Sequence, residues 1–155
     1  MNHFNIRVYG ILINENKEVL ITDEFRFGKE MTKFPGGGLI WGEGTIDCLK
    51  REFKEELVCE IEVLEHLYTT DFFQKSAFHE EHQIISIYYW VKNKNLLSLP
   101  KKLSLSGEDS GENRDFQSFR WIPVSEISAD DFTFPIDKRV AEMLARSAGG
   151  LRHQK

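Results

Sequence analysis

The chain has 155 residues, of which 41% are hydrophobic and 29% are charged, with 20 Lys and Arg against 25 Asp and Glu. This length and composition predict one globular domain over residues 1–148, followed by a frayed tail at residues 149–155. The net charge of -5 excludes a broad cationic surface for the phosphate backbone of DNA or RNA. No nucleic-acid polymer is therefore expected as a partner.

The sequence also predicts a cytoplasmic protein without a membrane partner. The first residues lack the basic start and continuous apolar stretch of a signal peptide. The longest mostly apolar run, residues 84–91, is far shorter than the roughly 20 residues that a helix needs to cross a bilayer. Cys48 and Cys59 form no Cys-x-x-Cys pair, and we expect both to be small buried side chains in a reducing compartment.

The first third of the chain predicts a hairpin, a loop and a helix. Two runs rich in β-branched and aromatic residues, 6–13 and 19–25, flank a polar turn and predict a β-hairpin. Residues 33–38 read Lys-Phe-Pro-Gly-Gly-Gly and predict an irregular loop, because Pro lacks a backbone donor and Gly adopts angles that other residues avoid. A periodic segment then predicts a helix over Thr45–Leu57, with Thr45 as its N-cap.

The remainder predicts more strands and a final helix. Residues 62–72 and 82–92 have strand character, and the second of these runs is apolar on both faces, as in a central strand that is covered on both sides. Residues 116–122 predict another strand and residues 136–148 a helix. Strands with one helix in the middle and one at the end predict an α/β fold, in which helices flank a mixed β-sheet.

The central helix has two distinct faces. At about 100° per residue, four apolar side chains form a stripe about 80° wide that is expected to pack on the sheet: Ile46, Leu49, Phe53 and Leu57. Three carboxylates occupy the neighbouring arc: Glu52, Glu55 and Glu56. Alone, this arc is typical of a solvated acidic surface. The glycine-rich loops ahead of it favour another interpretation, because glycine lets backbone approach a phosphate while carboxylates hold magnesium beside it.

The spacing of these residues resembles the Nudix box. Gly37 is followed after five residues by Glu43, and after seven more by Arg51-Glu52-Phe53-Lys54-Glu55-Glu56. Residues 34–37, 120–123 and 126–127 also resemble the surroundings of the box in that family. The resemblance implies an α/β/α sandwich and a hydrolase that cleaves a phosphoanhydride bond in a nucleoside diphosphate linked to another group. The substrate would be a nucleoside triphosphate or a nucleotide sugar, and the cofactor Mg²⁺ or Mn²⁺.

The resemblance also implies roles for individual residues. The three glutamates Glu52, Glu55 and Glu56 would be catalytic and would bind the metal, together with the backbone carbonyl of Gly36. Either Glu52 or Glu55 could be the general base, and the sequence leaves this choice open. Arg51, Glu43 and Gly37 are expected to give structural support to the site. The family's usual glycine two positions after the last glutamate is Val58 here, and because a β-branched residue resists positive φ, we expect the helix to end differently and slightly later.

Several residues outside the box are weaker candidates. Arg26 and Lys33 could bind substrate phosphate, and Glu108 or Glu112 could add a metal ligand. The run His79-Glu80-Glu81-His82 favours a charged turn over a metal site. Four aromatic residues could stack on a base, although aromatic residues in strands are more often core: Phe25, Phe27, Phe72 and Phe73.

Two other functions remain open. A non-catalytic nucleotide-binding sensor could keep the same fold, although the complete glutamate set argues against it. A diphosphate isomerase of the same superfamily would need further catalytic groups, which Cys48 and Cys59 are not placed to supply. The loops at residues 25–32, 71–81 and 93–113 would select the substrate, which the sequence does not identify. A homodimer is a further expectation from the family.

Overall fold

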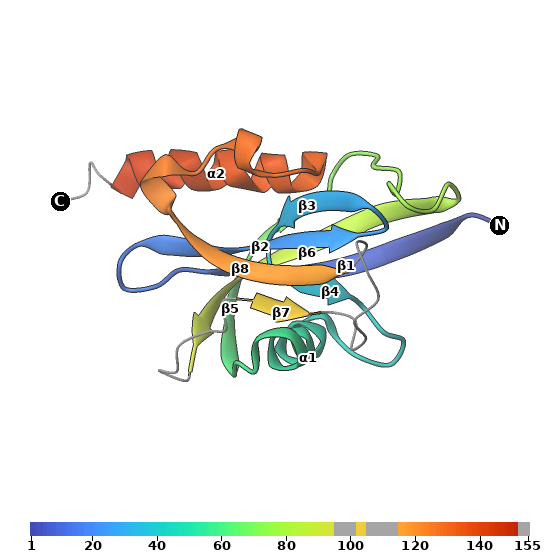
Figure 1. Ribbon diagram of the computed structural model, residues 1–155, viewed down its shortest axis with the longest axis horizontal. Helices are drawn as coiled ribbons and strands as arrows, with labels where there is room; N and C mark the ends of the chain where they lie inside the picture. Colours follow the sequence, from blue (N-terminus) through green and yellow to red (C-terminus); the bar gives the residue numbers. More distant parts are fainter. Residues whose placement is uncertain (95–101, 105–114, 152–155) are drawn as a thin grey trace. The chain divides into compact units, whose positions relative to one another are not determined.

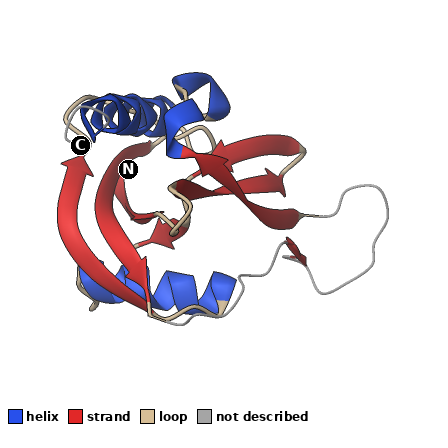
Figure 2. Ribbon diagram, turned by 90° about the vertical axis from the view of Figure 1, so that its left-hand side faces the viewer, coloured by secondary structure: helices blue, strands red, loops and turns tan. Residues whose placement is uncertain are grey.

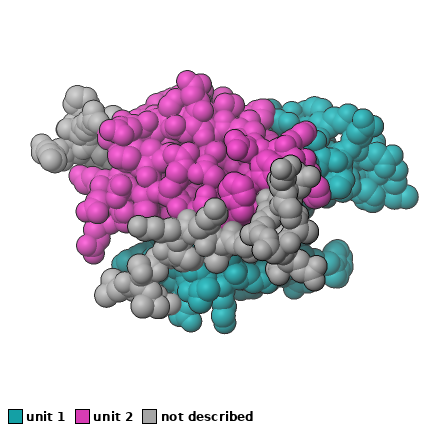
Figure 3. All heavy atoms as spheres, viewed as in Figure 1, with its two compact units in different colours: residues 1–12, 35–97 teal, residues 13–34, 98–155 magenta. Residues whose placement is uncertain are grey.

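The computed structural model describes residues 1–94, 102–104 and 115–151. The chain forms two compact units, each made of two chain segments (Figure 3). Unit 1 comprises Met1–Leu12 and Pro35–Leu97, and unit 2 comprises Ile13–Phe34 and Ser98–Lys155. Each unit contains one four-stranded sheet and one longer helix. Figure 2 distinguishes the helices from the strands by colour. None of the helices in the described part is long and apolar enough to cross a membrane.

Unit 1 is a mixed sheet with a helix packed on it. Its strands lie in the order β4-β1-β6-β5, with β1 and β6 parallel and the two outer pairs antiparallel. Helix α1, Thr45–Leu57, contacts β4, β5 and β1 (Figure 1). The strands are β1 (His3–Leu12), β4 (Gly36–Gly38), β5 (Ile61–Thr69) and β6 (His82–Asn93).

Unit 2 is an antiparallel sheet in the order β3-β2-β8-β7. Its strands are β2 (Glu18–Arg26), β3 (Lys29–Lys33), β7 (Lys102–Ser104) and β8 (Phe116–Pro123). Two short 3₁₀ helices follow, η1 (Val124–Glu126) and η2 (Ala129–Asp131), and both contact helix α2 (Pro135–Leu151). The rings of Phe34 and Phe132 stack with centroids 4.4 Å apart, and α2 buries Ile136, Val140 and Leu144.

The predicted α/β class, with helices and a mixed sheet, is confirmed. The helix predicted over Thr45–Leu57 is α1 with the same bounds. The predicted strand at residues 82–92 is β6, which lies inside its sheet between β1 and β5 as expected. Its side chains are only partly covered, however, and Ser86, Tyr88 and Val91 are its buried residues. The last helix, expected at residues 136–148, is α2 and continues to Leu151.

The predicted hairpin between the first two strands is wrong. The polar turn exists, since the Asn14 N–H donates to the Glu18 carbonyl at 2.9 Å and Ile13 forms a single bridge with Val19. Beyond this turn β1 and β2 enter different sheets. The reason is that both edges of each strand are already paired, those of β1 by β4 and β6 and those of β2 by β3 and β8.

The glycine-rich stretch is more regular than predicted, because Gly36–Gly38 forms strand β4, antiparallel to β1. Gly36 has φ 149°, and a Cβ added there would lie 2.7 Å from the Cα of Tyr9. Only glycine lets the two backbones approach this closely. The same property that suggested a loop therefore permits a tightly packed strand.

The caps at both ends of α1 differ from those predicted from the sequence. The N-cap is Gly44, and Thr45 is already helical, with its hydroxyl 2.8 Å from the Tyr89 hydroxyl. Ile46 is half-exposed, while Cys48 takes its place among the buried residues of the helix.

At the C-terminal end, Val58 adopts the left-handed conformation with φ 49° and ψ 39°. Its N–H donates to the Lys54 carbonyl at 3.1 Å. The helix therefore ends where a glycine would end it, and the expected extension is wrong.

Candidate active site

A tight turn leads from β4 into α1. The Glu43 N–H donates to the Ile40 carbonyl at 3.2 Å, and the Ile40 N–H donates to Oε1 of Glu43 at 2.9 Å. Gly42 lies between them, with φ 95°. The third position of such a turn needs a positive φ, which glycine adopts readily. The Glu43 side chain thus closes its own turn and orients its second oxygen toward the helix.

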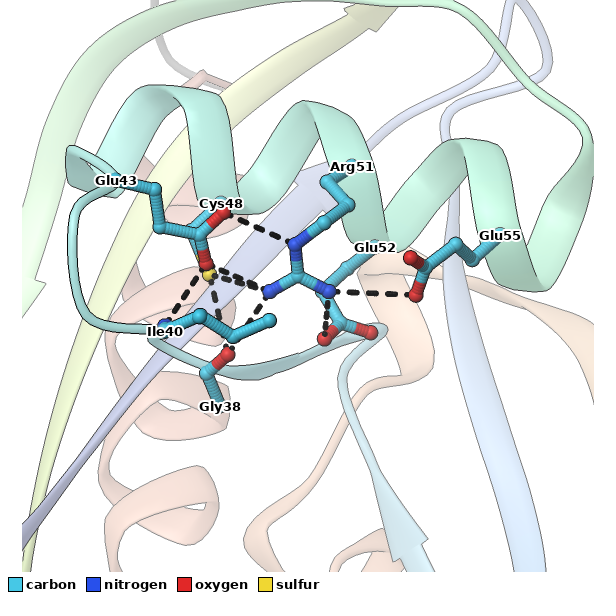
Figure 4. Close-up of polar contacts among 7 residues, drawn as sticks. All are labelled: Gly38, Ile40, Glu43, Cys48, Arg51, Glu52 and Glu55. Atoms are coloured by element: carbon cyan, nitrogen blue, oxygen red, sulfur yellow. Dashed lines mark hydrogen bonds and ion pairs between the residues drawn. The ribbon is translucent and has the colours of Figure 1, made fainter.

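Arg51 binds that carboxylate at two points. Its Nε donates to Oε2 of Glu43 at 2.9 Å and its Nη2 donates to Oε1 at 2.7 Å (Figure 4). Both side chains are largely shielded from solvent. Such two-point pairing uses the planar guanidinium fork and fixes its orientation. The loop and the second turn of α1 are joined by this contact.

The same guanidinium reaches two of the predicted catalytic glutamates. Nη1 donates to Oε1 of Glu52 at 2.9 Å and to Oε2 of Glu55 at 3.3 Å. Nη2 also donates to the Gly38 carbonyl at 3.1 Å. Arg51 therefore offsets the repulsion between these neighbouring carboxylates (Figure 4).

The ion pair shifts the protonation of both partners. The hydrogen bonds from Arg51 lower the pKa of Glu43 from 4.5 to about 2, against the opposing effect of burial. The hydrogen bonds to Glu43 likewise raise the pKa of the Arg51 guanidinium above its usual value. Glu43 is consequently a fixed anion at any physiological pH, which suits a structural partner better than a proton carrier.

Cys48 is a member of this network that the sequence interpretation left out. Its thiol donates to the Gly38 carbonyl at 3.5 Å, and Nη2 of Arg51 lies 3.7 Å from the sulfur. Burial, aided by hydrogen bonding to Glu43, raises the pKa of the thiol to about 12. Cys48 and Cys59 are both buried free thiols, as predicted. The spacing of Cys48 one turn before Arg51 on α1 was the available signal.

Gly37 gives Glu52 its space. A Cβ added at Gly37 would lie 2.5 Å from Oε1 of Glu52, which is closer than real side-chain contacts allow. The Glu52 carboxylate therefore rests against bare backbone of β4. The sequence spacing between Gly37 and Glu52 matters because any larger residue at position 37 would displace the Glu52 carboxylate.

A divalent metal fits this site by the chemistry of its donors. Glu52 is largely shielded, Glu55 is 60% exposed and Glu56 is half-buried, and all three offer the hard oxygens that Mg²⁺ and Mn²⁺ prefer. Within residues 1–94, 102–104 and 115–151, no three His, Cys, Asp or Glu side chains are already arranged to hold a metal. A cation would have to take over the oxygens of Glu52 and Glu55 that Arg51 contacts.

The two cationic candidates lie in unit 2, in a cluster around Glu24. Nζ of Lys33 lies 3.1 Å from Oε1 of Glu24, and Nε of Arg26 lies 3.6 Å from Oε2. Glu24 is only 3% exposed, and Gln117 also donates to its Oε1 at 3.0 Å. The sequence interpretation missed Glu24 and Gln117, whose pairing across β2 and β8 depends on strand register.

The remaining candidates are placed as follows. Glu108 and Glu112 lie outside the described residues. The rings of His79 and His82 are 4.7 Å apart, but they belong to no metal-binding group in the part of the chain that the structure describes. Phe25 stacks on Phe116 at 5.8 Å, whereas three other aromatic side chains are exposed to solvent: Phe27, Phe72 and Phe73.

The chain is similar to known proteins in sequence and in structure. The sequence model of the NUDIX domain matches residues 3–144. The MutT protein from Methanosarcina mazei Go1 is similar in structure, with 18% identity and a TM-score of 0.68 over 95% of this chain and 96% of that one. The E. coli ORF135 protein has 18% identity and a TM-score of 0.66, covering 95% and 94%. No curated protein matches the chain in sequence.

A structure described as a UDP-X diphosphatase is also similar, with 12% identity and a TM-score of 0.59 over 96% of this chain and 66% of that one. At these identities the neighbours establish the fold. The fold and the loop–helix site define an α/β protein in which a helix that carries glutamates follows, and packs on, a glycine-rich strand. Because the NUDIX domain covers most of its length, the chain belongs to the Nudix family.

Proposed function

We propose that this protein is a metal-dependent hydrolase that cleaves a phosphoanhydride bond of a nucleoside diphosphate linked to another group. The observation that carries the proposal is the Arg51 network, which holds Glu52 and Glu55 on one flank of α1 beside the bare backbone of Gly37. Members of the Nudix family are typically pyrophosphohydrolases that use divalent metals. The substrate would be a nucleoside triphosphate or a nucleotide sugar.

Each residue has a defined part in this proposal. Glu52, Glu55 and Glu56, with the Gly36 carbonyl, would hold Mg²⁺ or Mn²⁺. When bound, the metal polarises the phosphoryl oxygens and lowers the pKa of an attacking water. Glu52 or Glu55 accepts a proton from that water as its oxygen bonds to phosphorus and the bridging P–O bond breaks.

Arg51, Glu43 and Gly37 would keep the glutamates in position without touching the reacting atoms. Arg51 remains tied to Glu43 by two hydrogen bonds even if its contacts to Glu52 and Glu55 are given up to a cation. Arg51 would thus keep its hydrogen bonds to Glu43 and to the Gly38 carbonyl throughout the reaction. The buried, high-pKa thiol of Cys48 offers no nucleophile, which weighs against the isomerase alternative.

The proposed substrate is a small diphosphate, whose negative charge would attract cationic side chains. Arg26 and Lys33 remain candidates for contacting it. Lys33 is only 11% exposed and is engaged by Glu24, so its charge serves mainly to hold that buried carboxylate. Arg26 retains 40% exposure of its side chain and is the more accessible of the two to a phosphate.

The test is turnover with a substrate panel. Purified protein is incubated with Mg²⁺ and nucleoside triphosphates, ADP-ribose, dinucleoside polyphosphates and nucleotide sugars, and the released phosphate-containing products are measured. We expect turnover of at least one compound and its loss in Glu56→Gln. Glu65→Gln, at an exposed position of β5, serves as the matched control and should keep wild-type activity.

The melting temperature of Glu56→Gln without metal should be unchanged or raised, because the substitution removes one of three neighbouring negative charges. Normal activity in this variant would refute the metal role of Glu56. Thermal stabilisation by a nucleotide without any hydrolysis would instead favour the non-catalytic sensor. The predicted cytoplasmic location and homodimer are further expectations that this experiment does not address.

A further inference from the structure

Helix α1 covers only part of one face of the unit 1 sheet. A Cβ added at Gly10 would lie 2.9 Å from the Phe53 ring, so Gly10 and its alternate neighbour Val8 face the helix. The same alternation places Ile6 and Phe4 on this face, nearer the start of β1. Val8 is buried, but Ile6 is only half-buried and Phe4 is 68% exposed. The N-terminal end of β1 extends beyond the helix, as Figure 1 shows.

Strand β6 continues this surface beside β1. The two strands are parallel, and register partners such as Ile6 and Ile85 have their side chains on the same face. Tyr89 is the register partner of Gly10, and its hydroxyl lies 2.8 Å from the Thr45 hydroxyl on α1. Ile85 precedes Tyr89 by four residues, so it also faces the side of the helix, yet it is only half-buried. The first halves of both strands therefore expose apolar side chains where α1 does not cover them.

The loop that leads into α1 adds a fully exposed tryptophan. The Leu39 N–H donates to the Ile6 carbonyl at 2.9 Å, so the loop leaves β4 beside this part of β1. Trp41 follows two residues later, and its side chain is fully exposed. Its turn is closed by the hydrogen bonds between Ile40 and Glu43. The backbone that carries the indole ring is thus held in one conformation.

Two further apolar side chains border the same surface. Ile46 lies about 20° from Phe53 on the helix, so it points toward the sheet, but it is half-exposed because it lies in the first turn. Lys75 forms a bridge with Gln83 of β6, and Phe73, two residues before Lys75, is 71% exposed. We call the following six side chains the uncovered face: Phe4, Ile6, Trp41, Ile46, Phe73 and Ile85.

The uncovered face is large for a single chain. An aromatic side chain buries about 150–250 Å², so Phe4, Trp41 and Phe73 together leave roughly 500 Å² exposed. The largest apolar patch on a typical monomer is about 300–600 Å². Two copies that packed these three rings against each other would bury roughly 1,000 Å², the area that a specific interface should reach, before the isoleucines are counted.

The chemistry of the uncovered face suits a second copy of this chain. A two-fold symmetric contact places one surface against itself, so a net charge on that surface would repel its copy. None of the six side chains is charged, although the whole chain has a net charge of -5. Tryptophan and phenylalanine are also enriched at the buried centres of interfaces, where charged residues are depleted.

We propose that the uncovered face is the interface of a two-fold symmetric homodimer, with Trp41 as an anchor residue. The turn at residues 40–43 orders the backbone of Trp41 before association, which reduces the entropy cost of binding. Ile46 and Glu55 lie about 180° apart on α1, so a partner that packs on Ile46 leaves the Glu55 side of the helix open. The inference does not depend on the proposed hydrolysis, because it concerns a different surface.

The test measures the mass of the full chain by sedimentation equilibrium over a range of concentrations. We expect a dimer that dissociates on dilution. Trp41→Glu and Phe4→Glu should each raise the dissociation constant at least about thirtyfold, because each places a charge in an apolar contact on both copies. Leu64→Glu, at a half-exposed apolar position of β5 outside the uncovered face, is the matched control and should dimerise like the wild-type chain. Circular dichroism checks that all three variants are folded.

Tryptophan fluorescence provides a second measurement. Trp41 is fully exposed, whereas Trp90 and Trp121 are half-buried. Burial of Trp41 in the dimer should therefore shift the emission to shorter wavelength as the concentration rises. Trp41→Phe keeps an apolar ring at the interface, so it should still form dimers, but without this shift in emission.

Two results would overturn the proposal. The first is a wild-type chain that stays monomeric at about 100 μM, well above the dissociation constants of micromolar or less that interfaces of standard size show. The uncovered face would then be left for a partner of another kind. The second is a dimer that keeps wild-type affinity in both Trp41→Glu and Phe4→Glu, because the two copies would then meet through another surface.

Discussion

Arg51 and Glu43 are joined by two hydrogen bonds, Nε to Oε2 at 2.9 Å and Nη2 to Oε1 at 2.7 Å. Glu43 belongs to the turn before α1, and Arg51 projects from the helix itself. The pair therefore sets the position of the glycine-rich segment relative to the helix. Since Arg51 also contacts Glu52 and Glu55, the shape of the loop and the orientation of the glutamates depend on one guanidinium.

Acid should weaken the fold through Glu43. The pKa of Glu43 is about 2 in the folded chain, below its ordinary value of 4.5. Above pH 4.5 the carboxylate is ionised in both states, and its contribution to stability is fully present. As the pH falls from about 4.5 toward 2, the unfolded chain gains the proton first, so this contribution is progressively lost. Urea unfolding between pH 6 and pH 2.5 measures the slope, which should be shallower in Glu43→Gln. Identical slopes in the two proteins would contradict the assignment.

Arg51→Lys should be destabilising although it keeps the charge. Lysine is a point donor and cannot reproduce the fork that spans Glu43, Glu52 and the Gly38 carbonyl. We expect the melting temperature to fall by roughly 2–6 °C, the range that the loss of one or two charge-assisted hydrogen bonds produces in a chain of this length.

Lys54→Arg, on the exposed side of the same helix, is the matched control and should melt like the wild-type chain. A double-mutant cycle that combines Arg51→Lys with Glu43→Gln measures the coupling free energy between the two residues. Additive effects of the two substitutions on stability would show that the residues are not coupled.

The helix and its acidic flank could be predicted because both depend on local periodicity. Helical spacing places a helix at residues 45–57, although its two caps were predicted wrongly, and the same wheel places Glu52 and Glu55 on one side of it. The wheel could not decide between Ile46 and Cys48 as a buried residue, because that depends on how the sheet lies under the helix. Position on the helix was thus predictable, and burial at the edge of the stripe was not.

Strand pairing could not be predicted for a different physical reason. The parallel partner of β1 is β6, which follows it in the chain only after β2, β3, β4, α1 and β5. No local pattern encodes such a long-range choice, and the neighbouring run at β2 was the obvious but wrong partner. The cluster of Glu24 with Gln117 depends on the register between β2 and β8 in the same way. The three proposed metal-binding glutamates avoided this difficulty because Glu52, Glu55 and Glu56 all lie on one helix.

Val58→Gly should stabilise the protein. Val58 is an exposed β-branched residue in the left-handed conformation, which costs an L-residue roughly 1–2 kcal/mol. Glycine adopts this conformation without that cost, although it loses more entropy on folding. We expect a net gain of about 1 kcal/mol in the free energy of unfolding, measured by urea denaturation. Val58→Ala should gain little, because alanine still has a Cβ. A lower stability for Val58→Gly would show that the valine side chain makes a compensating contact.

Gly36→Ala and Gly37→Ala should separate stability from activity. At Gly36 a Cβ would press on the Tyr9 backbone at a φ of 149°, and neither backbone can yield cheaply. We expect a loss of about 2–4 kcal/mol in the free energy of unfolding, as for other strained or overpacked substitutions. At Gly37 the three atoms nearest to the Cβ would all belong to the end of the Glu52 side chain, which can rotate away. Gly37→Ala should therefore melt within a few degrees of the wild-type chain, yet lose at least about tenfold in kcat/KM, because a displaced carboxylate no longer serves the metal. Parallel measurements of melting and turnover test both variants, and full activity in a folded Gly37→Ala protein would remove Glu52 from the proposed site.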